Sequence, residues 1–140
     1  MAQEEKDLLL RDLCARLPYG VKIHLDEKHI DEFPYNGTYM DFCIKLGING
    51  SSANLLKNIE KYGVKPFLRP ISSMTEEEED SLAELNCYHD NKGLYFSCGH
   101  SQNDICDVIN FLNSHHFDYR GLIEKGLAIE APNNMYINIK

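Results

Sequence analysis

The stretch Val21-Lys22-Ile23-His24-Leu25-Asp26 alternates apolar with polar side chains. Successive residues of a β-strand point to opposite faces, so this pattern predicts a strand whose apolar face packs on a core. Immediately before it, residues 4–17 carry apolar side chains every three or four positions, and Pro18 follows. That spacing predicts an amphipathic helix that ends near Leu17. The two-residue alternation and the spacing of three or four residues together indicate a fold that contains both strands and helices.

Downstream of this strand, Asn36-Gly37 is a dipeptide that favours a tight hairpin turn. Apolar residues then alternate again, at Met40, Phe42, Ile44 and Leu46. The N-terminal half therefore predicts an antiparallel β meander whose strands are adjacent in sequence. Its strands would span Val21–Asp26, Ile30–Tyr35 and Thr38–Leu46.

The second half predicts mainly helices. A helix near residues 52–62 would close at Gly63, and residues 64–70 hold two prolines and should run extended. Thr75 and Glu78 form a capping box that starts another helix. Asn86–Gly93 has the composition of a loop. A fourth helix is expected from the apolar stripe Ile105, Val108, Ile109 and Leu112, with Ser101 and Asp104 as a second capping box. Asp118 would cap a short helix that Gly126 ends.

These elements predict an α+β fold in which a small antiparallel β meander packs with an N-terminal helix and a C-terminal helical cluster. The chain has 140 residues, which is the usual size of one domain, so residues 1–140 are expected to form a single domain. No apolar run is long enough to cross a bilayer, and the N-terminus is acidic where a signal peptide would be basic. A cytoplasmic protein without a membrane partner is expected.

Charge is distributed unevenly along the chain. The net charge is −8, and residues 71–140 hold twelve acidic side chains against four basic ones. Five acids are consecutive: Glu76, Glu77, Glu78, Glu79 and Asp80. In the first turn of a helix they would be stabilised by the helix dipole, which is a purely structural role. As a surface they would favour a basic protein partner and repel nucleic acid, so direct nucleic-acid binding is not expected.

Two Cys-x-His pairs, Cys87/His89 and Cys98/His100, supply the thiolates and imidazoles that a tetrahedral zinc site uses. Their internal spacing is shorter than the two to four residues typical of zinc modules. The structural alternative is two buried cysteines and two surface histidines. Cys98 before a helix would also suit a nucleophile, with His100 or a distant histidine as its base. Five cysteines in a chain without an export signal are otherwise read as reduced thiols.

Ionisable and aromatic side chains gather between the last two predicted helices, at His115, His116, Tyr119 and Arg120. A loop of this kind is a candidate partner-binding site. The structural alternative is that the histidines end a helix, where protonated imidazole is favoured, and that Arg120 pairs with a nearby acid on the surface.

Phosphate-loop, dinucleotide, zinc-protease, serine-hydrolase and calcium-loop motifs do not occur in the sequence. The leading hypothesis is therefore a non-enzymatic protein-interaction module with an acidic face and no cofactor. The alternative is a small zinc-binding or thiol-dependent protein that uses the Cys/His cluster. A third hypothesis is an acidic mimic of nucleic acid that occupies a DNA-binding protein.

Three segments carry a resemblance: LLLRDLCARLPYGV (residues 8–21), VKPFLRPISSMTEEE (64–78) and FDYRGLIEKGLA (117–128). Together they resemble a family of short, uncharacterised proteins of gut-dwelling bacteria and their prophages. The match covers under half of the chain and excludes residues 26–62 and 86–104. The resemblance implies a cytoplasmic bacterial or prophage protein, and it carries over no catalytic residues because the family has no assigned activity.

Overall fold

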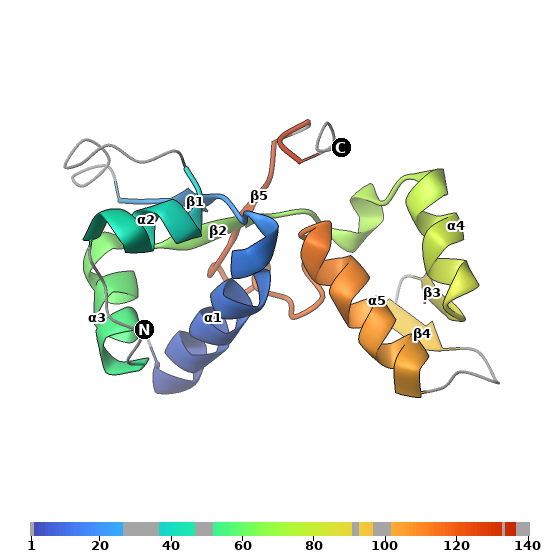
Figure 1. Cartoon of the computed structure of the whole chain (residues 1–140), viewed down its shortest axis with the longest axis horizontal. Helices are drawn as coiled ribbons and strands as arrows, with labels where there is room; N and C mark the ends of the chain where they lie inside the picture. The colour runs from blue at the N-terminus through green and yellow to red at the C-terminus, as the bar shows by residue number, and fades with distance from the viewer. Residues whose placement is uncertain are drawn as a thin grey trace.

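The computed structural model describes residues 2–26, 37–46, 52–90, 93–96, 102–132 and 134–136. The regular elements are, in chain order, α1 (Gln3–Arg16), β1 (Ile23–His24), α2 (Tyr39–Leu46), α3 (Ser52–Tyr62), β2 (Lys65–Leu68), α4 (Glu76–Glu84), β3 (Cys87–Asp90), β4 (Gly93–Phe96), α5 (Gln102–Ser114) and β5 (Ile129–Glu130). The α+β class and the N-terminal helix are thus confirmed. Helices α1, α2 and α3 lie at one end of the molecule with β1 and β2, and α4, α5 and the β3–β4 hairpin lie at the other (Figure 1).

The first core forms where α1, α2 and α3 pack on the small sheet. It includes Leu9, Leu13, Phe42 and Ile59, which are almost completely buried. The predicted helix at residues 52–62 is confirmed as α3, and Gly63 ends it with a positive φ of 62°. A side chain at Gly63 would overlap the Asp26 carboxylate, so this turn requires glycine.

The sheet in this core has the strand order β1-β2-β5. Strand β1 pairs antiparallel with β2 through Ile23 and Pro66, whereas β5 pairs parallel with β2. The extended segment predicted at residues 64–70 is confirmed. Among the described strands, β1 and β2 are consecutive and so are β3 and β4, which confirms the expectation of sequence-adjacent pairing for these two pairs. The expectation is wrong for β2 and β5, which are distant in sequence and parallel.

The predicted strand Thr38–Leu46 is a helix, α2, and this is the main correction to the meander. The Thr38 hydroxyl accepts a hydrogen bond from the Asp41 N–H at 3.2 Å, as a helix N-cap does. Tyr39 and Phe42 are buried, while Met40 and Ile44 are exposed, a spacing of three that fits a helix. The middle strand predicted at Ile30–Tyr35 lies outside the described residues.

The second core lies among α4, α5 and the hairpin. Leu82, Cys87, Val108, Leu112 and Phe117 are its most buried members. The loop predicted at Asn86–Gly93 is wrong at Cys87–Asp90, which forms β3 and pairs antiparallel with β4. Within the described part of the chain, no helix combines the length and the apolar character needed to span a bilayer.

Candidate functional site

A buried ionic network joins the two cores. On α1, Asp12 accepts hydrogen bonds from Arg16 Nε at 2.9 Å and from Arg120 Nη1 at 2.6 Å. Asp12 and Arg16 are completely buried, and Arg16 also donates to the backbone carbonyl of Phe117. Arg120 pairs with an acid, as predicted, but this acid is buried and not on the surface. The network positions the segment after α5 against α1, which is a structural role.

The acidic block divides into one inward and four outward side chains. The Glu78 carboxylate accepts hydrogen bonds from Nη1 and Nη2 of Arg69, each at 2.7 Å. It also accepts a hydrogen bond from the Thr75 N–H, which confirms the predicted capping box. Burial raises the pKa of Glu78, but the hydrogen bonds from Arg69 and Thr75 outweigh it and leave the pKa lowered. Glu76, Glu77, Glu79 and Asp80 are exposed. Glu78 thus has a structural role, since it binds Arg69 and caps the helix, and its four acidic neighbours face solvent.

The two adjacent histidines occupy different environments at the end of α5. His115 is partly exposed, stacks on Phe111 with ring centroids 4.2 Å apart, and lies 3.9 Å from a Glu78 oxygen. His116 is completely buried and has a positive φ of 60°. Its Nε2 donates to the Tyr19 carbonyl at 3.0 Å.

The expectation of a protonated imidazole is wrong for His116. Burial and the nearby Arg16 lower its pKa to about 4, and the Tyr19 carbonyl only partly opposes this shift. Its Nδ1 has no hydrogen-bond partner in the described part of the chain, so a proton added there would be buried without an acceptor. His116 is therefore neutral at pH 7. Its ring packs against the ring of Tyr136, with the two centroids 4.1 Å apart.

Tyr119 and Asp118 fix the segment that follows α5. The Tyr119 hydroxyl donates to Asn113 Oδ1 at 2.7 Å. The Asp118 carboxylate accepts the N–H groups of Leu122 and Ile123, each at 2.9 Å. The predicted capping role of Asp118 is confirmed, but residues 122–126 form consecutive turns and not a helix.

The candidate zinc ligands are only half described. Cys87 is completely buried, and burial raises the pKa of its thiol, which disfavours the thiolate that zinc binds. His89, on the same strand face, lies 3.3 Å from Glu79 Oε1. Cys98 and His100 lie outside the described residues. Over the ranges that are described, no three Cys, His, Asp or Glu side chains gather as a metal would require, so the zinc hypothesis stays a prediction.

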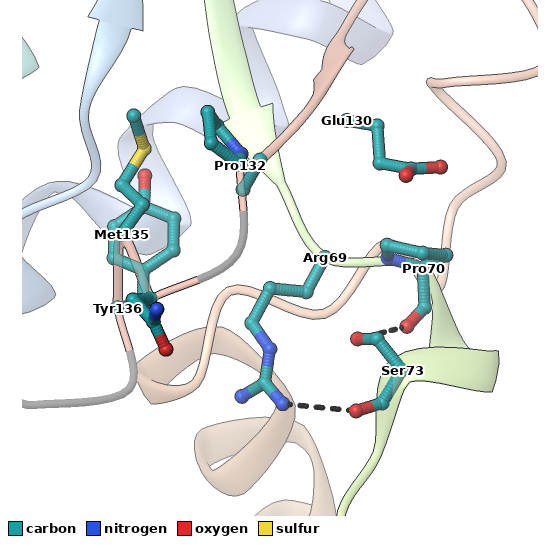
Figure 2. Close-up of a pocket in the computed structure, with 9 residues that line it drawn as sticks. Arg69, Pro70, Ser73, Glu130, Pro132, Met135 and Tyr136 are labelled. Carbon is teal, nitrogen blue, oxygen red and sulfur yellow. Dashed lines mark hydrogen bonds between the residues drawn. The ribbon is translucent and has the colours of Figure 1, made fainter.

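A small pocket of about 90 Å³ lies beside Arg69, between the sheet and the chain's last described turn. Figure 2 shows Arg69 turned toward the Ser73 carbonyl, with Met135 and Tyr136 on the opposite side. The charge of Arg69 is already neutralised by Glu78. This pocket has room for a few water molecules, and the exposed Glu130 supplies a carboxylate at its edge.

A much larger and open groove lies at the other end of the molecule. It has a volume of about 1010 Å³ and is lined by the turn Ile71–Ser73, strands β3 and β4, and residues 118–124. Asp90, Asp118 and Glu124 supply carboxylates, and the described lining residues include no lysine or arginine. Sequence reasoning missed this groove, because its walls come from three distant segments and the hairpin was not predicted.

Another exposed feature is the outer face of the hairpin. Tyr88 and Tyr95 face each other across β3 and β4, with ring centroids 5.8 Å apart. They are 39% and 49% exposed, which is high for paired aromatic side chains. Tyrosine is enriched in protein interfaces.

Comparison of the chain with protein-family models, curated proteins and solved structures gives no match.

Proposed function

We propose that this protein is a non-enzymatic interaction module of a bacterial or prophage cytoplasm, and that an acidic face binds a basic partner protein. The observation that carries the proposal is the orientation of the acidic side chains of α4. Its nine residues include no lysine or arginine, and among its acids Glu78 is the one that turns inward. Glu76, Glu77, Glu79, Asp80 and Glu84 are exposed and form the acidic face.

Several exposed features near the acidic face support a binding role. His89 Nε2 lies 3.3 Å from Glu79 Oε1, so the acidic face borders one face of strand β3, and Tyr88 lies on the opposite face of that strand. Carboxylates pair with arginine, and exposed aromatic rings stack on its guanidinium, so both exposed features suit a partner that contains arginine. Electrostatic complementarity of this kind increases the rate and the selectivity of association.

Three of the described thiols are poorly suited to catalysis. Burial raises the pKa of Cys14, Cys43 and Cys87, so these cysteines are poor nucleophiles at neutral pH. The four cysteines in the described ranges are all unpaired. Reduced cysteines are typical of cytoplasmic proteins, which supports the proposed location.

Affinity capture from a lysate of the organism that encodes the protein tests the proposal. The bait is the native protein or a variant neutralised on the acidic face, Glu76→Gln, Glu77→Gln and Asp80→Asn. A matched control, Glu4→Gln, Asp7→Asn and Asp107→Asn, removes the same charge from exposed positions elsewhere. We expect a basic protein that the native bait and the control retain and that the acidic-face variant loses.

Salt provides the second arm of this test. Surface charge interactions are screened over about 8 Å at physiological ionic strength and over about 3 Å at 1 M salt. The captured protein should therefore elute when the salt is raised. A partner retained equally by all three baits and at high salt would contradict the proposal.

A further inference from the structure

Tyr136 interrupts the pairing of strands β1 and β2 at one position. Lys22 precedes β1 and lies opposite Phe67 of β2, as the register of Ile23 with Pro66 requires. The Phe67 N–H donates directly to the Lys22 carbonyl at 2.9 Å. In the other direction the Tyr136 hydroxyl accepts the Lys22 N–H at 2.8 Å and donates to the Phe67 carbonyl at 2.9 Å. One of the two hydrogen bonds that such an antiparallel pair exchanges is therefore replaced by a bridge through a side chain.

This arrangement has a second state in which the bridged backbone groups are still paired. When Tyr136 leaves, the Lys22 N–H can donate directly to the Phe67 carbonyl, which completes the antiparallel pair. The sheet therefore does not oppose the release of Tyr136. Residues 134–136 form a strap with a docked state, in which Tyr136 bridges the strands, and a detached state.

The ring of Tyr136 also covers His116. The two ring centroids are 4.1 Å apart, His116 is completely buried, and Tyr136 is 6% exposed. Nε2 of His116 bonds the Tyr19 carbonyl, but Nδ1 has no hydrogen-bond partner among the described residues. A proton taken up on Nδ1 needs an acceptor, and water supplies one once the covering ring moves away. Uptake of a proton by His116 thus favours the detached strap.

The groups around His116 oppose the proton while the strap is docked. Burial lowers the pKa of His116 most, and three groups lower it further, against the effect of the Tyr19 carbonyl, to about 4. These groups are Arg16 of α1, His115 at the end of α5 and Arg69 after β2. The carboxylates of Asp12 and Glu78 are each bound to one of the two arginines. Tyr136 stays neutral, because burial raises the pKa of its hydroxyl.

His116 therefore links the strap to pH. Its pKa is about 4 in the docked state, and it rises toward the ordinary value of 6.5 in the detached state, where water reaches the ring. Between these two values the detached state binds a proton that the docked state does not bind. The ratio of detached to docked strap should then rise by about tenfold for each pH unit of acidification.

We propose that residues 134–136 form a pH-sensitive strap, which Tyr136 docks at neutral pH and which acid releases through His116. Met135 and Tyr136 form the wall of the pocket opposite Arg69, as Figure 2 shows, so release opens that side of the pocket to solvent. This device does not depend on the proposed interaction function.

Two-dimensional NMR of the full chain, titrated from neutral pH to about pH 4, tests the strap. The backbone amides of Lys22 and Met135 report on the strap, and the amide of Leu9, in the first core, reports on global unfolding. We expect the two strap signals to move below about pH 6.5 while the Leu9 signal stays in place. His116→Asn should hold both strap signals at their neutral-pH positions, whereas the control His115→Asn should titrate like the native protein.

A Tyr136→Ala variant gives the signal positions of the detached strap, toward which the native signals should move. It also provides a test that does not require His116→Asn to fold. Because water reaches His116 in this variant at every pH, the midpoint of its Cε1–H signal should move from about 4 toward 6.5. The matched control Tyr136→Phe keeps the covering ring and should leave this midpoint near the native value.

Three outcomes would overturn the strap. The first is an unchanged His116 midpoint in Tyr136→Ala, since the ring would then not control the access of water. The second is movement of the Lys22 and Met135 signals only together with the Leu9 signal, since His116 would then titrate through global unfolding. The third is a native titration of both strap signals in a folded His116→Asn variant.

Discussion

At the scale of single residues, buried His116 makes stability depend on pH. Its pKa is lowered from 6.5 to about 4 in the folded chain. Between these values the unfolded chain binds a proton that the folded chain does not, so stability falls as pH falls from about 6.5 to about 4. Above about pH 6.5, His116 is neutral in both the folded and the unfolded chain, so its titration no longer changes the stability. The loss is about 3 kcal/mol at most, from the size of the shift.

Urea denaturation across this pH window measures the effect. We expect His116→Asn to flatten the pH dependence of the unfolding free energy, since asparagine tolerates the positive φ and carries no titrating group. His115→Asn is the matched control, because His115 is partly exposed, and it should keep the slope of the native protein. Parallel pH profiles for all three proteins would show that His116 is not the source.

Cys87 and His89 allow a second prediction at the residue scale. Their surroundings, a buried thiol and an imidazole beside Glu79, favour packing over coordination. Metal analysis of dialysed, untagged protein should therefore find no stoichiometric zinc. One retained equivalent of zinc that is lost in a Cys98→Ser variant would support the alternative hypothesis of a Cys/His metal site.

At the scale of elements, α4 depends on its cap. Thr75→Ala should cost about 1 kcal/mol of unfolding free energy, a typical value for an N-cap. Glu78→Gln should cost about 2 kcal/mol or more, because it leaves Arg69, which is 6% exposed, without its charged partner. Chemical denaturation of each variant gives these values.

Glu79→Gln is the control for this pair of variants, since it removes the same charge one residue later at an exposed position. We expect a change within about 0.5 kcal/mol. If Glu78→Gln and Glu79→Gln were equally mild, the inward role of Glu78 would be wrong.

The elements also show how far the sequence predicts the fold. Local signals identify α1, α3, α4 and α5, because each combines a helical apolar stripe with a cap or a terminating residue. Residues 38–46 satisfy two patterns at once: alternation fits a strand, and Tyr39, Phe42 and Cys43 fit a helix. The overlooked signal is Thr38 three residues before Asp41, a capping pattern. Packing on the first core decides between the two.

Some features of the candidate sites could be predicted from the sequence, and others could not. The sequence identifies the acidic block and the capping role of Asp118. It could not show that Glu78 turns inward, because the position of Arg69 is set by tertiary structure. One readable clue to the ionic network existed: Asp12 and Arg16 lie among Leu9 and Leu13 on the apolar stripe of α1. Polar residues on such a stripe indicate a buried pair.

At the scale of the whole molecule, two hydrophobic cores meet at the Asp12 network. Asp12→Ala would leave Arg16 buried without a charged partner, which costs about 3–5 kcal/mol in comparable sites. It should also weaken the coupling between the cores. Hydrogen exchange should then show the α5 amides opening at a lower free energy than the α3 amides, whereas in the native protein we expect both sets of amides to open together.

Asp7→Ala is the control for this substitution, since Asp7 lies on the same helix at an exposed position. It should leave the exchange of both helices unchanged. If Asp12→Ala lowered protection in α3 and α5 by equal amounts, the network would stabilise the molecule without coupling its two cores.

The acidic face of α4 is proposed to bind a basic partner. The most direct measurement is the affinity of the purified, captured partner for the native protein and for a reversed variant, Glu76→Lys, Glu77→Lys and Asp80→Lys, over a series of salt concentrations. We expect the native affinity to fall steadily as salt rises, and the reversed variant to bind at least about tenfold more weakly at low salt, with the difference vanishing at high salt. Equal affinities for the two proteins at every salt concentration would contradict it.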